Sequence, residues 1–443
     1  MPKSSVDYLC SDCGTSSPVS LGRCPRCGSW ASMQPRPQES SNQRAESRRG
    51  RVALVQPLEE VSEAELYRHS SGNDEVDRVL GGGWVSGSVL LLAGEPGIGK
   101  STLLLQLAHL AAENQRTSLY VAGEESAAQV RLRADRLGLA GGLQLTRETD
   151  ARALAAYLRS EPPQLTIVDS IQTLTAEDAA TPGTLTQVRD STALLVAAAK
   201  ETGSTLVLIG HVTKQGSIAG PKVVEHMVDA TLSLESAAGY RVLRAIKNRF
   251  GPAGEMGVFE MTGEGMRTVP NPSEAFLSER PLGVPGSVVA ATLEGQRPLL
   301  LEVQALAAKS PYASPRRVVQ GLDSRRVDVV LAVLERRLEL PLTGLDIFVN
   351  VAGGLRLTDP GTDLAVALAV YSAVTNQVLP DETAVLGEVG LAGEVRAVTQ
   401  QERRRSEAVR SGFGNVIEPA GNSREAHGIR SVHQAVERVW GTR

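Results

Sequence analysis

The sequence contains no run of 18 apolar residues, and residues 1–7 lack the apolar core of a signal peptide. Neither a membrane-spanning helix nor a secretory leader is therefore expected, and we predict a soluble, cytoplasmic protein without a membrane partner. The chain also lacks a strong charge of one sign, because its formal net charge is −4 over 443 residues. No global positive field favours nucleic acid, so any DNA contact would have to come from local basic patches.

Cysteine is scarce and confined to one place. All four cysteines lie in the first 27 residues, as the pairs Cys10/Cys13 and Cys24/Cys27. Two Cys-x-x-Cys pairs supply the four thiolates of a structural Zn²⁺ site and leave no thiol over. Two disulfides are the alternative, but they need an oxidising compartment, and nothing in the chain directs export. We expect zinc to replace the hydrophobic core that so short a segment cannot build.

The length of the chain requires more than one hydrophobic core. We expect a zinc finger at residues 1–33, a flexible linker at 34–65 and two further domains at 66–270 and 280–443. The linker prediction rests on residues 34–50, which are rich in Pro, Ser, Gln and Arg and show no periodicity. Its basic residues either contact phosphates or, as is commoner, are only solvated. They are Arg44, Arg48, Arg49 and Arg51.

A glycine-rich loop follows the apolar run 89–93. It consists of Gly94, Glu95, Pro96, Gly97, Ile98, Gly99, Lys100 and Ser101, and Thr102 continues it into an apolar-rich stretch. Glycines let the backbone point its N–H groups at a polyphosphate. Lys100 would then neutralise the β- and γ-phosphates, and Ser101 would ligate Mg²⁺. A chance glycine turn is the alternative, but the position between a strand and a helix favours a site for ATP with Mg²⁺.

Two further apolar runs end in carboxylates. Asp169 ends the run 165–169, where it would hold the metal through water, unless it only closes a core strand. Glu124 and Glu125 follow the run 118–122, and one of them would polarise the attacking water. We favour Glu124 as this catalytic residue. The alternative is that both glutamates cap the next helix, because acidic residues are favoured in a first turn.

His211 follows the apolar strand 205–210, next to the expected position of the γ-phosphate. It would report the state of the nucleotide to the glycine-bearing loop 213–222, or it is an ordinary histidine bonded at a strand end. Lys214 and Lys222 in that loop would contact a DNA backbone.

Lys247 and Arg249 flank one residue at the end of the strand expected at 240–246. A cation that reaches the leaving phosphate assists phosphoryl transfer, and a neighbouring subunit often supplies it. A charged hairpin is the alternative.

Apolar strands alternate with helical stretches through the central part of the chain, which predicts an α/β domain with a parallel sheet covered on both faces. The strands are expected at 89–93, 118–122, 165–169 and 205–210, and the helices at 101–113, 126–137, 150–159 and 185–201.

In this order the motifs resemble the bacterial RadA (Sms) family of DNA repair proteins. The resemblance covers essentially the whole chain, and its most specific element is Lys-Asn-Arg-Phe-Gly at 247–251. It implies a RecA-like, DNA-dependent ATPase that forms hexameric rings, is related to DnaB-type helicases and drives branch migration during homologous recombination. Its partners would be single-stranded and branched DNA and the RecA recombinase. On that basis Lys247 and Arg249 act on the site of a neighbouring subunit, and the loop 213–222 faces DNA.

Residues 280–443 resemble the α+β proteolytic domain of Lon, through the stretches 346–356, 359–365 and 387–395. Lon-type cleavage uses a Ser-Lys dyad. This chain has Asp363 at the serine position and, by extension of the register, Glu402 at the lysine position, so we expect no protease activity. Asp359 and Asp363 would instead stabilise the start of a helix. Six arginines of this domain either guide duplex DNA or are solvated: Arg316, Arg317, Arg325, Arg326, Arg336 and Arg337.

Two other functions stay open at this point. One is an ATP-dependent protease of the Lon class, against which the missing serine and lysine count. The other is a nucleotide-gated scaffold that binds DNA and displaces nothing.

Overall fold

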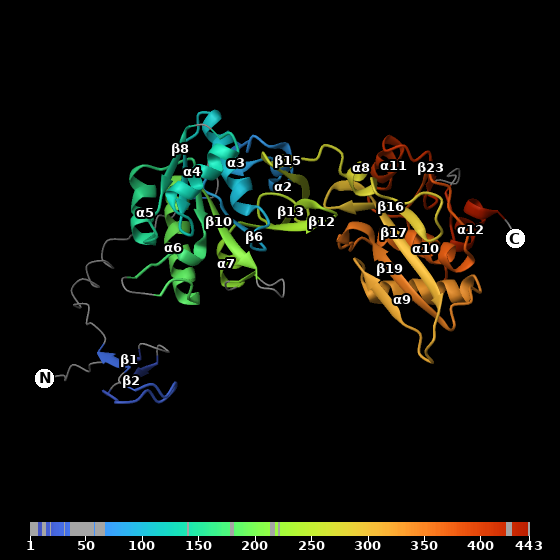
Figure 1. The fold of residues 1–443 in the computed structure, drawn as a ribbon, viewed down its shortest axis with the longest axis horizontal. Helices are drawn as coiled ribbons and strands as arrows, with labels where there is room; N and C mark the ends of the chain where they lie inside the picture. Colours follow the sequence, from blue (N-terminus) through green and yellow to red (C-terminus); the bar gives the residue numbers. More distant parts are fainter. Residues whose placement is uncertain are drawn as a thin grey trace. The chain divides into compact units, whose positions relative to one another are not determined.

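The chain divides into two compact units, residues 1–63 and 64–443. The computed structural model describes residues 8–10, 15–17, 19–30, 32–35, 57, 67–139, 141–177, 181–212, 218–219, 222–421 and 428–441. Figure 1 follows the helices and strands of both units along the sequence. Cys13, Lys214 and the four linker arginines lie outside the described residues.

The N-terminal unit contains a small antiparallel sheet in the order β2-β1-β3. Its strands are β1 (Tyr8–Cys10), β2 (Ser16–Ser17) and β3 (Met33–Pro35). Cys10, Cys24 and Met33 form its buried cluster. Since β3 pairs with β1 as far as Pro35, this unit reaches two residues beyond the boundary expected at residue 33.

The second unit contains a ten-stranded sheet in the order β15-β14-β13-β12-β6-β10-β9-β7-β8, with β11 beside β10. The strands from β12 to β8 in this order run parallel to their neighbours. They are β12 (Ala230–Ala237), β6 (Val89–Gly94), β10 (Thr205–Val212), β9 (Leu165–Asp169), β7 (Ser118–Ala122) and β8 (Leu143–Thr146). The antiparallel strands are β13 (Tyr240–Asn248), β14 (Met256–Thr262), β15 (Gly265–Thr268) and the short β11 (Ile218–Ala219).

Helices lie against both faces of this sheet, so its central strands are buried on two sides. On β6, Leu90 and Leu92 pack into one apolar cluster, and Val89 and Leu91 pack into the other. The helices are α2 (Asp74–Leu80), α3 (Lys100–Glu113), α4 (Ala127–Arg136), α5 (Ala151–Ser160), α6 (Leu185–Thr202) and α7 (Lys222–Met227). The predicted strands and helices agree with the structure to within two residues at each end.

The C-terminal part forms a six-stranded sheet in the order β18-β19-β17-β16-β20-β23. Its strands are β16 (Ser287–Glu294), β17 (Arg297–Lys309), β18 (Arg317–Gln320), β19 (Leu345–Val351), β20 (Thr383–Val385) and β23 (Asn415–Ile417), beside the hairpin of β21 (Glu388–Val389) and β22 (Val395–Arg396). The accompanying helices are α8 (Pro272–Leu277), α9 (Ser324–Arg337), α10 (Asp363–Thr375), α11 (Gln401–Arg410) and α12 (Val432–Trp440).

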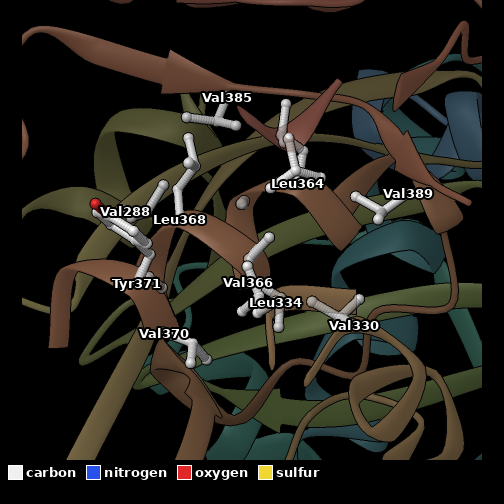
Figure 2. Close-up of a cluster of buried hydrophobic side chains, with 14 of the residues drawn as sticks. Val288, Val330, Leu334, Leu364, Val366, Leu368, Val370, Tyr371, Val385 and Val389 are labelled. Atoms are coloured by element: carbon white, nitrogen blue, oxygen red, sulfur yellow. The ribbon is translucent and has the colours of Figure 1, made fainter. Parts of the chain in front are cut away.

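Helix α10 is the centre of this C-terminal core. Figure 2 shows Leu364 and Leu368 of α10 among side chains from α9, β16 and β20, with Leu334 and Val385 on different sides of the helix. All residues of α10 from Asp363 to Ser372 are buried, as expected for a helix that is apolar on every face.

The central and C-terminal sheets pack together as one unit. Arg297 at the start of β17 pairs with Glu75 of α2 at 2.5 Å, and Arg244 of β13 pairs with Glu294 of β16. One apolar cluster includes Val242 and Val258 from one sheet and Leu299 and Leu301 from the other. The domain boundary expected between 270 and 280 therefore crosses a continuously packed region. None of the helices in the described ranges is long and apolar enough to cross a bilayer.

Candidate nucleotide site

The phosphate loop connects the end of β6 to the first turn of α3. Gly97 and Gly99 have φ angles of +76° and +112°, which glycine adopts without strain. A Cβ on Gly94 would lie 2.6 Å from the carbonyl oxygen of Leu234, so this position also requires glycine. Since Gly99 precedes α3 and has no side chain to cap it, the first N–H groups of the helix stay available to an anion.

Lys100 lies buried at the start of α3 and folds over the loop. Its Nζ donates to the carbonyl oxygens of Gly94 at 2.8 Å and Glu95 at 2.9 Å. Burial lowers the pKa of this amine, while the nearby carboxylates of Asp169 and Glu124 act in the opposite direction. The predicted lysine and the two predicted acids therefore come together at one end of the sheet.

Asp169 ends β9 next to β7, with Ala122 as its partner in register. Its buried carboxylate accepts a hydrogen bond from the Tyr120 hydroxyl at 2.5 Å. Burial and the neighbouring Asp169 raise the pKa of Tyr120, so the tyrosine stays a donor. Tyr120 has no sequence signal that indicates this role, because a tyrosine inside an apolar strand looks like an ordinary core residue.

Glu124 and Glu125 have different partners. The Ser170 hydroxyl, immediately after Asp169, donates to the Glu124 carboxylate. Arg133 of α4 donates to Glu125 instead. The cap of α4 is Ser126, whose hydroxyl accepts from the Gln129 N–H while the Gln129 side chain accepts from the Ser126 N–H. Neither glutamate is needed as the cap, and Glu124 is the one that lies at the phosphate end.

His211 lies on β10, and its backbone is in register with Gly94, where the phosphate loop begins. The strand therefore brings the backbone of this residue to the start of the loop. Most of the loop 213–222 lies outside the described residues.

Lys247 and Arg249 lie at the opposite end of the sheet. Asn248 is in register with Ala230, which is in register with Leu90 at the amino end of β6. β6 spans six residues, which at about 3.3 Å per residue places its two ends roughly 17 Å apart. These cations therefore cannot serve the phosphate loop of their own chain, and a catalytic role requires a second subunit.

Three of the predicted zinc ligands meet in the N-terminal unit. The Sγ atoms of Cys10, Cys24 and Cys27 lie within 4.8 Å of one another, and those of Cys10 and Cys27 are 3.6 Å apart. Tetrahedral Zn²⁺ with Zn–S bonds of about 2.3 Å places its sulfurs about 3.8 Å apart. The spacing of the three described sulfurs therefore fits a tetrahedral metal site.

Comparisons with known proteins agree with this geometry. Residues 58–217 match the family model of an AAA domain, residues 8–35 match the rubredoxin metal binding domain, and residues 316–422 match subunit ChlI of Mg-chelatase. The DNA repair protein RadA of Pseudomonas aeruginosa is 46% identical over 434 residues, which cover 96% of this chain and 94% of that protein. The chain belongs to the RadA family of DNA repair proteins.

RadA of Escherichia coli K12 is 45% identical, over 94% of this chain and 92% of that protein, and RadA of Bacillus subtilis is 43% identical, over 95% and 94%. A KaiC-like protein of Pyrococcus horikoshii aligns with 46% of this chain and all of its own, at 20% identity and a TM-score of 0.41. The chain thus has the RecA-like ATPase domain, zinc ribbon and Lon-like C-terminal domain that its motifs predict for a RadA protein.

The residues at the two Lon-dyad positions, Asp363 and Glu402, do not resemble a nucleophile paired with its base. Asp363 is buried, pairs with Arg326 and accepts the Val389 N–H at 3.2 Å. Burial raises its pKa, although Arg326 acts in the opposite direction. Glu402 lies on the surface, where its carboxylate pairs with Arg405 at 2.6 Å.

Asp359 caps the 3₁₀ turn η5 (Pro360–Thr362) through the Gly361 N–H, as expected of a carboxylate near a helix start. Asp363 is the first residue of α10, but its partners are Arg326 and the Val389 N–H, neither of which belongs to that helix. Asp359 also pairs with the buried Arg404 of α11. These arginine partners were not anticipated, because they come from 37 and 45 residues away in sequence.

Proposed function

We propose that this protein is a DNA-dependent ATPase, a hexameric motor of homologous recombination that promotes branch migration of recombination intermediates. One observation supports this most directly. Lys100, Asp169 and Glu124 lie together at the carboxyl end of the sheet, whereas Lys247 and Arg249 lie at the amino end. A complete phosphoryl-transfer site then forms only between subunits, as a closed ring allows.

Each residue of the site has a role in this proposal. Residues 94–102 hold the triphosphate through backbone N–H groups, and Lys100 leaves the loop carbonyls to bind its β- and γ-phosphates. Ser101 and Asp169 would hold Mg²⁺, which when bound supplies positive charge to the phosphate oxygens. Glu124, oriented by Ser170, accepts a proton from the attacking water. His211 at the end of β10 reports the nucleotide state to the loop that follows.

The four thiolates of Cys10, Cys13, Cys24 and Cys27 would hold Zn²⁺ as a structural ion. The three described cysteines support this, because their Sγ atoms lie within 4.8 Å of one another. The zinc module would contact a protein partner, and the RecA recombinase is the partner that the family resemblance implies.

Single-stranded and branched DNA are the proposed polynucleotide partners. The loop 213–222 and arginines among the six named in the C-terminal domain would contact their phosphates. Two of the six arginines already have acidic partners, since Arg317 pairs with Asp328 and Arg326 pairs with Asp363. Arg316, Arg325, Arg336 and Arg337 are therefore the better candidates for a DNA backbone.

Mixing inactive subunits tests the shared site. Arg249→Ala leaves the phosphate loop intact but removes the cation offered to a neighbour, and Lys100→Ala does the opposite. Each variant alone should hydrolyse ATP slowly, and an equimolar mixture should regain part of the turnover. Arg189→Gln, an exposed arginine of α6 paired with Asp190, is the control and should keep full turnover. Absence of recovery in the mixture would contradict a site shared between subunits.

A further inference from the structure

Asp229 is a buried acid immediately before β12. It belongs to none of the motifs identified in the sequence. Its backbone N–H donates to the Val89 carbonyl at 2.8 Å, and its Oδ2 accepts the Val89 N–H at 3.1 Å. Val89 is the first residue of β6, the strand whose other end carries the phosphate loop. Asp229 is therefore attached to this strand by both its backbone and its side chain.

The other side of Asp229 faces the Lys-Asn-Arg-Phe-Gly motif. The Arg249 N–H donates to the Asp229 carbonyl at 3.1 Å, and its Nη1 lies 3.2 Å from Asp229 Oδ1. The same oxygen is 3.3 Å from the Nζ of Lys200. Both cations stay about half exposed, at 54% for Arg249 and 49% for Lys200, whereas the Asp229 side chain is only 5% exposed.

Asp229 therefore holds Arg249 and Lys200 in a way that leaves both cations accessible to a second subunit, and it does not bury them. A buried carboxylate keeps its charge only when it is paired, and here it is paired with the charged ends of two side chains that are about half exposed. Asp229 holds Arg249 by its backbone N–H and by Nη1 of its guanidinium, which leaves other guanidinium N–H groups to meet a phosphate. An arginine held in this way loses less conformational freedom on meeting that phosphate, which is the usual advantage of preorganised catalytic groups. Lys247 is held differently, because two backbone carbonyls of its own chain, those of Glu225 and Val228, accept from its Nζ at 2.7 Å each.

We propose that Asp229 is a positioning residue for the shared ATPase site. Its carboxylate anchors Arg249 to the first residue of the phosphate-loop strand and so fixes the direction in which one subunit offers this cation to its neighbour. The proposal rests on the function proposed above, because it requires that Arg249 act on the nucleotide of another subunit.

The test uses full-length protein carrying Asp229→Asn, which removes the charge and keeps the shape. Turnover should fall by about tenfold or more, less than the largest losses known for a missing arginine finger. The affinity for ATP should stay close to that of the wild type, because the phosphate loop is untouched. Mixing with Lys100→Ala subunits, whose Arg249 is intact, should recover part of the turnover. The double variant Asp229→Asn/Arg249→Ala should be no slower than Arg249→Ala alone.

Two further variants keep this test decisive. Glu294→Gln breaks a comparable buried pair with Arg244, which lies on the same strand as Lys247, and it should leave turnover unchanged. If Asp229→Asn does not fold, Asp229→Glu retains the charge, displaces Arg249 by one methylene and should show the same recovery on mixing.

The outcomes distinguish a failure of the positioning role of Asp229 from a failure of the shared ATPase site. Full turnover of the Asp229 variants overturns the positioning role, and so does a loss that Lys100→Ala subunits fail to recover although they recover Arg249→Ala. If Arg249→Ala itself keeps full turnover or is not recovered, the shared site is wrong, and the role of Asp229 falls with it.

Discussion

At the scale of single residues, Glu124 and Glu125 show how the fold separates two identical neighbours. Ser170 donates to Glu124 at the phosphate end of the sheet, and Arg133 pairs with Glu125. Glu124→Gln should therefore bind ATP normally but hydrolyse it about 10²- to 10⁴-fold more slowly, the usual contribution of a general base. Glu125→Gln is the matched control. Steady-state turnover and nucleotide binding by the two variants decide the assignment, and it is reversed if only Glu125→Gln is slow.

The pair of Arg404 and Asp359 is a residue-scale prediction about stability. The Arg404 side chain is fully buried, and Asp359 also accepts from the N–H groups of Gly361 and Leu293. Arg404→Met leaves this carboxylate buried without its cation, which should lower the free energy of unfolding by about 3–5 kcal/mol. Urea denaturation would measure this. Arg405→Met, which breaks a surface pair on the same helix, should cost about 1 kcal/mol or less.

The same pair predicts how stability depends on pH. Burial alone would raise the pKa of Asp359, but the hydrogen bonds and charge of Arg404 outweigh it and hold this pKa below the ordinary value of 3.8. A depressed folded-state pKa contributes stability above the unfolded-state pKa, and this is lost as the pH falls through the folded-state pKa. The difference in unfolding free energy between wild type and Asp359→Asn should therefore be constant near neutral pH and shrink below about pH 4. A difference that grows on acidification would contradict this sign.

The phosphate loop could be identified from sequence because its chemistry is local, with eight consecutive residues between a strand and a helix. The choice between Glu124 and Glu125 could be stated but not decided, because Ser170 lies 46 residues away from Glu124. Arg404 and Asp229 carried no local signal, since an acid or an arginine in an amphipathic stretch is usually a solvated residue.

At the scale of elements, the zinc ribbon depends on metal more than on burial. Among the residues that the structure describes there, the apolar cluster contains only Cys10, Cys24, Met33 and partly buried neighbours. The free energy of metal binding is therefore expected to supply most of the stability of this unit. Cys24→Ser should release zinc and loosen this unit while the ATPase melting temperature stays unchanged. Metal analysis with calorimetry checks this. Stoichiometric metal retained after the substitution would contradict a four-thiolate site.

The strands that could be predicted well from the sequence are those buried on both faces, such as β6 and β10. Such strands appear in the sequence as continuous apolar runs. β8 was missed because it lies at an edge of the sheet and none of its four residues is buried, so it has no apolar run. The order of the strands could not be derived from the pattern either. The neighbours of β6 are β10 and β12, which follow it by more than 100 residues.

At the scale of the whole molecule, the Lon-like domain predicts a negative result. Asp363 is held by Arg326, and Glu402 pairs with Arg405 at the surface, so the two dyad positions offer no nucleophile and base. Casein should remain uncut when the protein, ATP and Mg²⁺ are incubated together. A Lon protease assayed in parallel provides the positive control. ATP-dependent release of peptides that Asp363→Asn abolishes would reopen the protease interpretation.

The most direct test of the whole account is ATP turnover with no DNA, single-stranded DNA, duplex DNA and forked DNA, each at two salt concentrations. A motor whose DNA contacts are made by lysines and arginines should hydrolyse ATP faster when single-stranded or forked DNA is added. Higher salt should weaken this stimulation, because counterion release opposes phosphate contacts. Purified protein that consumes no ATP with any of these DNAs would contradict a DNA-dependent ATPase.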